Sequence, residues 1–362
     1  MAHGVGQRGP AAAAPLNQEK QSNLLSADFL VLPQAELHLH LEGSLQPETV
    51  CALAAKYGVP ASTQEVLQRY AYRDFLEFIE TFKWVSSLLR APEDFALALH
   101  DLGEQLLEQN VVYSEITLSV GVMLLRHQSP EKNFEAIVAA AESFRSRGLQ
   151  FNFVFDAVRQ FGAEAAMKVV EAAERCASKS IVAFGIGGDE LSIPAKEFRP
   201  VYQKAGVMGL HKLMHAGEVG GPEEIRQAIE LLGAERIGHG IAAVRDPSLM
   251  DLLAERRIPL EICPQSNIRT GALAKQLGLP TAQIEQHPMP QLFRHGIPMV
   301  LSTDDPAMFH TDLRSEYENA CRMGLQETEL ERIAKMGFEY AFINNHDKVA
   351  LQRVGRSTST SN

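Results

Sequence analysis

The sequence has 362 residues, of which 45% are hydrophobic and 22% are charged, a composition typical of a globular protein with a sizeable core. A formal net charge of −11 argues against nucleic acid or an anionic membrane as partner, because both attract basic surfaces. The apolar run 11–14 is too short for a signal-peptide core, and no later run approaches a membrane span. The four cysteines lack C-x-x-C spacing, which predicts free thiols in a reducing compartment, and the protein is expected in the cytoplasm.

From about Phe29 onward, short β-rich apolar runs alternate with amphipathic helical stretches, a pattern typical of parallel strands joined by crossover helices. Eight runs are predicted to be strands: 35–40, 111–118, 151–157, 182–187, 212–216, 237–240, 260–263 and 299–303. Helical patterns between the later strands include 133–146, 163–177, 222–232, 247–255 and 290–295. Eight strands are the number that closes a barrel, so the predicted fold class is α/β, a (β/α)8 TIM-like barrel.

One connection, after the first strand, is much longer than the others. It carries helical patterns at 47–57, 63–70, 75–89 and 92–109. An insertion there, at about 45–110, belongs to the catalytic end of a barrel and predicts a lid or pocket wall. No linker divides the chain, so we predict one domain at 29–350, a disordered tail at 1–28 and a flexible tail at 351–362. The sequence does not indicate an oligomeric state.

The first chemical motif is His38-Leu39-His40. Side chains alternate along a strand, so the two imidazoles point inward and the leucines point toward the helices. Neighbouring inward imidazoles are costly to bury unless they bind something, and imidazole is a common zinc ligand. The alternative is a pair of partly exposed histidines at a strand end.

Two further histidines end predicted strands. His215 closes the fifth strand, and Glu218 follows at the turn, positions that suit a metal ligand and a general acid or base. His239 lies between Gly238 and Gly240, which permit a close backbone approach around the imidazole. A single histidine after an apolar run is more often structural, but both lie at the end of the barrel where the first pair lies.

Asp304 and Asp305 follow the eighth strand. Adjacent buried carboxylates repel one another, and a nearby cation removes that cost. Because adjacent side chains face different ways, one acid can bind metal while the other faces substrate. The predicted metal ligands are His38, His40, His215 and Asp304. The groups left for proton transfer are Glu218, His239 and Asp305.

A zinc ion with an open position brings the pKa of bound water to about 7. From the residues alone this predicts metal-assisted hydrolysis and no particular substrate. The sequence shows neither an inward lysine on the fourth strand for a second metal nor the H-x-E and P-C-x-x-C pattern of another zinc deaminase class.

The chain closely resembles the adenosine deaminase family in four motifs: AELHLHLEGS (35–44), HAGEVGGPE (215–223), ERIGHG (235–240) and STDDP (302–306). The match runs in order from about residue 30 to 345. The resemblance implies a barrel with one zinc per chain, and a small-molecule purine nucleoside as substrate. The implied zinc ligands are His38, His40, His215 and Asp304.

The family's mechanism also implies a role for each remaining group. Zinc-activated hydroxide attacks C6 of the purine, while the residue that matches Glu218 protonates N1. The residue that matches His239 orients the water and takes its proton, and the one that matches Asp305 hydrogen-bonds N7. Gly188 matches the backbone position that contacts N3. Ammonia leaves, and a 6-oxopurine nucleoside results.

Comparison with the vertebrate and other members of the family shows several positions that bear on the substrate. Glu42 stands where those enzymes carry a shorter acid near the ribose. Gly238 argues mildly against free adenine as substrate. Arg269 is either a structural surface residue or a partner for a substrate carboxylate. Phe75 and Phe78 resemble the hydrophobic subsite near the sugar, with plain core packing as the alternative.

Three functions therefore stand side by side. The first is hydrolytic deamination of adenosine or deoxyadenosine. The second keeps the mechanism but takes 6-aminodeoxyfutalosine, of menaquinone biosynthesis, because FGIGG (184–188) and CPQSNIRTG (263–271) look more like that bacterial branch. The third is an inactive barrel that binds purine nucleosides, against which the intact ligand set and Glu218 argue.

Overall fold

The computed structural model describes residues 24–72 and 75–354 of the chain. Its eight strands are all parallel and follow one another around the sheet in chain order: β1 (Gln34–His40), β2 (Val111–Leu118), β3 (Gln150–Val158), β4 (Ile181–Gly187), β5 (His211–Ala216), β6 (Arg236–His239), β7 (Leu260–Ile262) and β8 (Met299–Leu301). The predicted α/β barrel is confirmed, and all eight strands lie within two residues of their predicted bounds.

The barrel closes between β8 and β1 through the segments that carry the site. The Asp304 N–H donates to the His38 carbonyl at 3.0 Å, and the His40 N–H donates to the Asp304 carbonyl at 2.8 Å. This backbone bridge fixes Asp304 beside both histidines before any side chain is considered. The backbone contacts that close the barrel therefore also bring these three site residues together.

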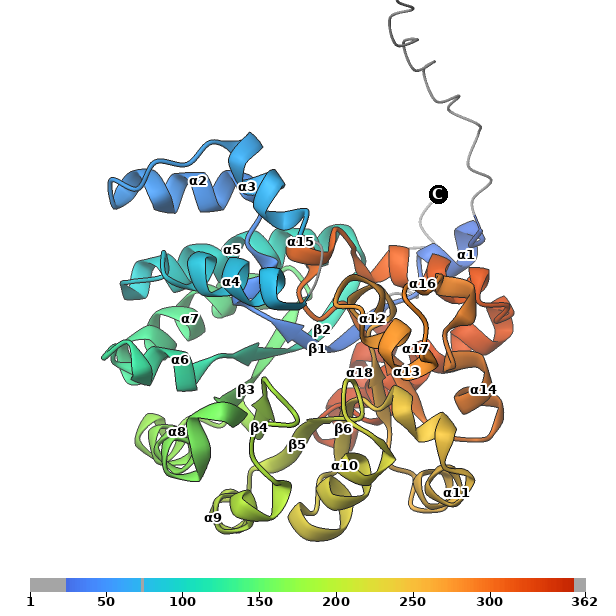
Figure 1. Cartoon of the computed structure of the whole chain (residues 1–362). Coiled ribbons are helices and arrows are strands. Elements are labelled where there is room, and N and C mark those ends of the chain that lie inside the picture. Colours follow the sequence, from blue (N-terminus) through green and yellow to red (C-terminus); the bar gives the residue numbers. More distant parts are fainter. Residues whose placement is uncertain (1–23, 73–74, 355–362) are drawn as a thin grey trace, which may run out of the picture.

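Helices surround the strands, and four of them form the insertion after β1 (Figure 1). The helices are α1 (Ala27–Leu30), α2 (Pro47–Lys56), α3 (Thr63–Tyr70), α4 (Phe75–Ser86), α5 (Pro92–Glu108), α6 (Val120–Leu125), α7 (Pro130–Arg145), α8 (Gly162–Cys176), α9 (Arg199–Val207), α10 (Pro222–Gln227), α11 (Pro247–Glu255), α12 (Pro264–Arg269), α13 (Ala272–Leu277), α14 (Met289–Arg294), α15 (Pro306–Phe309), α16 (Leu313–Arg322), α17 (Glu327–Glu339) and α18 (Asn345–Val354). Figure 1 shows α2 to α5 gathered on one side of the strands. Within the described ranges, no helix is long and apolar enough to cross a membrane.

The main core lies between the strands and the helices. Leu39 and Leu41, which alternate with the histidines of β1, are at most 1% exposed and belong to this core. A smaller cluster around Leu37 and Tyr113 packs under α17. The alternation predicted for the first strand is thus confirmed, with leucines outward and imidazoles inward.

The ends of the chain differ from their predicted extents. Leu25, placed by the sequence in the N-terminal tail, is only 2% exposed, and the Ser26 hydroxyl donates to Glu327 at 2.6 Å. The Ser26 hydroxyl also caps α1 by accepting from the Phe29 N–H. At the other end α18 continues to Val354, past the predicted boundary at residue 350. The rest of the two predicted tails, 1–23 and 355–362, lies outside the described residues.

Candidate metal centre and active site

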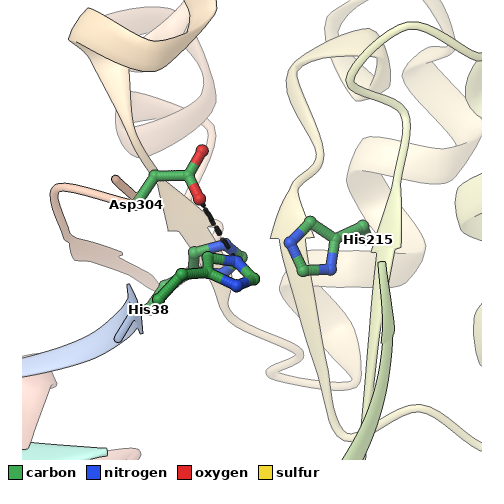
Figure 2. Close-up of side chains that lie close together, drawn as sticks. His38, His215 and Asp304 are labelled. Atoms are coloured by element: carbon green, nitrogen blue, oxygen red, sulfur yellow. Dashed lines mark ion pairs between the residues drawn. The ribbon is translucent and has the colours of Figure 1, made fainter. Parts of the chain in front are cut away.

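Four side chains from three parts of the barrel converge at the carboxyl ends of the strands. Each of His38, His40, His215 and Asp304 offers one ligand atom, and these atoms all lie within 4.8 Å of one another. Figure 2 shows His38 and Asp304 facing His215, which enters from the opposite side. Three imidazoles and one carboxylate are ligands that zinc prefers, so the four groups predicted as ligands come together as a set that fits this ion.

The charge states of His40, His215 and Asp304 also suit a cation. Burial lowers the pKa of His40 and His215 to about 3, so both imidazoles are neutral and keep a lone pair for a metal. Burial would raise the pKa of Asp304, but its hydrogen bond with His38 and the charges of the histidines hold that pKa well below its usual range. The His38 Nε2 is buried and lies 3.5 Å from Asp304 Oδ1.

Two residues of the site have unusual backbone conformations. Asp304 has φ of 65° and His239 has φ of 60°, in the left-handed region that few residues other than glycine adopt. Such strain costs on the order of 1–3 kcal/mol and persists only where the surrounding structure enforces it. Beside His239, Gly238 is needed for space, because a Cβ there would lie 2.9 Å from the His38 ring.

A buried chain of charged groups orients His38 from below. The Glu261 carboxylate lies 2.7 Å from His38 Nδ1 and also accepts from Arg236 Nε at 2.6 Å. Arg236 donates onward to Glu115, and Glu115 accepts from the Phe342 N–H. With Glu261 as acceptor, the proton of His38 resides on Nδ1, which leaves Nε2 free for a metal.

We expect Glu261→Gln to bind zinc about 10–100-fold more weakly, because the charged outer-shell partner of a metal ligand is lost and Arg236 keeps only one of its two carboxylate partners. Competition with a chromophoric chelator measures this affinity. Glu255→Gln, on an exposed turn of α11, is the matched control and should bind zinc like the wild type. An unchanged affinity in folded Glu261→Gln would contradict this role.

Three polar groups that the metal ligands leave free lie beside them. His239 is 1% exposed, and its Nε2 lies 3.8 Å from both the Glu218 and the Asp304 carboxylates. Burial and the charge of Asp304 raise the pKa of Glu218 to about 8. The same two causes raise the pKa of Asp305 well above its usual range. Both acids therefore favour the protonated form at neutral pH and can act as proton donors.

Residues of helix α12 and the turn after it contact these groups from one side, a role that was not predicted from the sequence. Ser266 donates to Asp304 at 2.7 Å, and the Asn267 side chain lies 3.2 Å from His239 Nδ1. Thr270, just past the helix, lies 3.4 Å from Glu218. The signal was present in the sequence, because polar residues at i, i+1 and i+4 after a predicted strand share one helical face.

A pocket opens over the cluster and joins it to the insertion. His40, Glu218, His239 and Asp305 line its polar side, and Gly188 lies on its wall. Phe75, Phe78, Ile79 and Phe82 of α4 form an apolar wall. The insertion is therefore a pocket wall, as predicted, and Phe75 and Phe78 contribute to the pocket as well as to the core.

Two predicted substrate residues lie elsewhere. Glu42 is 2% exposed, accepts from the Ser119 N–H at 3.1 Å and is absent from the described pocket lining, although Ser119 is part of it. Arg269 also falls outside the described lining; it donates to the Tyr70 carbonyl at 2.9 Å and its guanidinium lies 5.2 Å from the centre of the Tyr72 ring. Of its two interpretations, the structure supports the structural one, because Arg269 ties the end of α12 to the insertion.

Comparison with known proteins agrees with the fold. The sequence model described as adenosine deaminase matches residues 33–354. An aminodeoxyfutalosine deaminase of Streptomyces coelicolor is 36% identical over 90% of this chain and 84% of its own length. An adenosine deaminase of Vibrio cholerae is 33% identical over 88% of this chain and 96% of its own. The crystal structure of an adenine deaminase from Arthrobacter aurescens superposes with a TM-score of 0.83 at 26% identity, over 91% of this chain and all of that one.

The strands and the polar cluster thus define a (β/α)8 barrel protein with a site able to hold a metal. The chain belongs to the adenosine deaminase family, whose members deaminate adenine-containing substrates by hydrolysis.

Proposed function

We propose that the protein hydrolyses the 6-amino group of an adenine nucleoside, releasing ammonia and leaving the 6-oxopurine nucleoside. The observation that carries this proposal is the set of Glu218, His239 and Asp305, three unligated groups on the polar side of one pocket beside a four-ligand cluster. Zinc held by that cluster would acidify a water molecule, with a pKa of about 7.

Each of the three groups can exchange a proton or form a hydrogen bond with one polar atom of the purine or of the attacking water molecule. Protonated Glu218 donates to N1, which makes C6 more electrophilic. Burial lowers the pKa of His239 to about 4, so its neutral imidazole accepts the proton of the water. The purine N7 is an acceptor, and the raised pKa of Asp305 supplies the proton for a hydrogen bond to it.

Aminodeoxyfutalosine is the second candidate substrate, and the apolar wall of α4 favours it. The wall of Phe75, Phe78, Ile79 and Phe82 lines the same pocket as the groups that handle the purine. A substrate with a large group on its sugar would use that wall more fully than adenosine does. Two Streptomyces relatives at 36% identity carry this substrate in their names.

We expect the zinc-loaded protein to convert at least one nucleoside of a panel containing adenosine, 2′-deoxyadenosine, adenine and aminodeoxyfutalosine. The ultraviolet shift from 6-aminopurine to 6-oxopurine follows each reaction, and the ranking of kcat/KM assigns the preferred substrate. Free adenine should rank last, because it offers no sugar to the pocket. Conversion of adenine alone would contradict the nucleoside assignment.

A further inference from the structure

Asp156, near the end of β3, is a buried acid that the proposed reaction does not use. It is 5% exposed and lines the same pocket as Glu218 and Asp305. Its Oδ1 is buried, and nothing in the described part of the chain forms a hydrogen bond with it. A buried polar atom left unpaired is costly. Because the Asp156 side chain belongs to the lining of a pocket, we take this acid as a candidate partner for a ligand bound there.

The neighbouring strand leaves room for this carboxyl. Gly185 of β4 pairs with Asp156 across the sheet, and a Cβ at Gly185 would lie 2.8 Å from Asp156 Oδ1. A Cβ at Gly187 would lie 3.2 Å from Asp156 Oδ2 and 3.3 Å from the His215 ring. Gly187 thus keeps open the space between Asp156 and His215 of the metal cluster, and Gly185 leaves room for the carboxyl itself.

The place of Asp156 around the barrel identifies the part of the substrate that it meets. The reacting edge of the purine is occupied by Glu218, His239 and Asp305, which follow β5, β6 and β8. Asp156 belongs to β3, next to the β4 end that carries Gly188. The edge of a purine away from C6 and N7 bears N3 and the sugar, and the hydroxyls are the hydrogen-bond donors of that sugar.

We propose that Asp156 binds the sugar of the substrate, through a hydrogen bond between its carboxyl group and a 2′- or 3′-hydroxyl; this rests on the proposed nucleoside deamination. Burial raises the pKa of Asp156 to about 8, so near neutral pH the carboxyl is largely protonated. A neutral carboxyl both donates and accepts, and it avoids repulsion by Glu42, which acts on its titration.

The test compares Asp156→Ala and Asp156→Asn with the wild type on adenosine, 2′-deoxyadenosine and 3′-deoxyadenosine. We expect Asp156→Ala to lose about 10–100-fold in kcat/KM on adenosine, mostly through KM, as loss of one hydrogen bond to a buried acid would cause. On the deoxy analogue that lacks the contacted hydroxyl, kcat/KM of Asp156→Ala should be less than about threefold below that of the wild type. Asp251→Asn, an exposed acid paired with His295, is the control and should behave like the wild type.

Calorimetry with inosine and its 2′- and 3′-deoxy forms measures the same contact without turnover, and Asp156→Ala should weaken binding of inosine selectively. An equal loss on all three nucleosides, or no loss on any, would overturn the proposal. Turnover of adenosine by the wild type distinguishes failure of the role of Asp156 from failure of the proposed function. If the wild type deaminates adenosine but Asp156→Ala shows no selective loss, only the role of Asp156 is wrong. If the zinc-loaded wild type deaminates no nucleoside, the proposed function fails as well.

Discussion

Glu218→Gln should retain zinc yet lose at least about two orders of magnitude in kcat, because an amide has no proton of suitable acidity to give to N1 of the purine. Glutamine keeps the size of the side chain and can still meet Thr270, which lies 3.4 Å from the carboxylate. The backbone of residue 218 is held separately, since its N–H donates to Glu190 at 3.0 Å. The substitution therefore removes the acid and leaves the loop in place.

The pH profile gives this prediction a second readout. A raised pKa means that Glu218 keeps its proton up to about pH 8 and loses it above. Because the protonated form is the active one, kcat/KM of the wild type should fall as pH rises through that value, and the residual activity of Glu218→Gln should lack this fall. Glu223→Gln, an exposed residue at the start of α10, is the control. Near-normal turnover in Glu218→Gln would contradict its role as proton donor.

Asp304→Asn should bind zinc far more weakly than the wild type and be nearly inactive at one equivalent of zinc. The carboxylate is the one anionic ligand of the predicted set. Its removal should weaken zinc binding by more than the roughly 10–100-fold expected when an outer-shell partner is removed. Asparagine is the substitution of choice, because it tolerates the left-handed φ of 65° at this position better than most residues.

Metal analysis after dialysis against one equivalent of zinc, together with thermal unfolding, measures this outcome. Asp251→Asn is again the control, since its partner His295 is a surface residue. A folded Asp304→Asn protein that holds zinc as tightly as the wild type would show that Asp304 is not a ligand.

The sequence predicted the barrel because the signals for it are local. Each strand is an apolar run of limited length, and each chemical group, from His38 to Asp305, lies near the end of such a run or in the turn after it. Parallel strands bring their carboxyl ends to one face, so the order of motifs along the chain was enough to predict that these groups meet. The same reasoning placed the insertion at the pocket, where α4 now lies.

Other features depend on contacts between distant segments, which no local pattern reveals. The side chain of Arg269 is directed to Tyr70, 199 positions away, and this partner is invisible without the fold. Burial of Leu25 likewise depends on packing of the N-terminal segment, where Ser26 reaches Glu327. The space around the Asp156 carboxyl likewise depends on the glycines of β4, which lie beside it only in the folded barrel.

Zinc-dependent ammonia release from an adenine nucleoside tests the central claim most directly. Protein stripped with a chelator, then reloaded with one zinc per chain, is assayed for ammonia and for the 6-oxopurine product in the same sample. We predict no turnover in the stripped protein, and restored turnover with ammonia and product in equal amounts after reloading. Full turnover by the stripped protein, or none by the reloaded protein on any adenine nucleoside, would contradict the account.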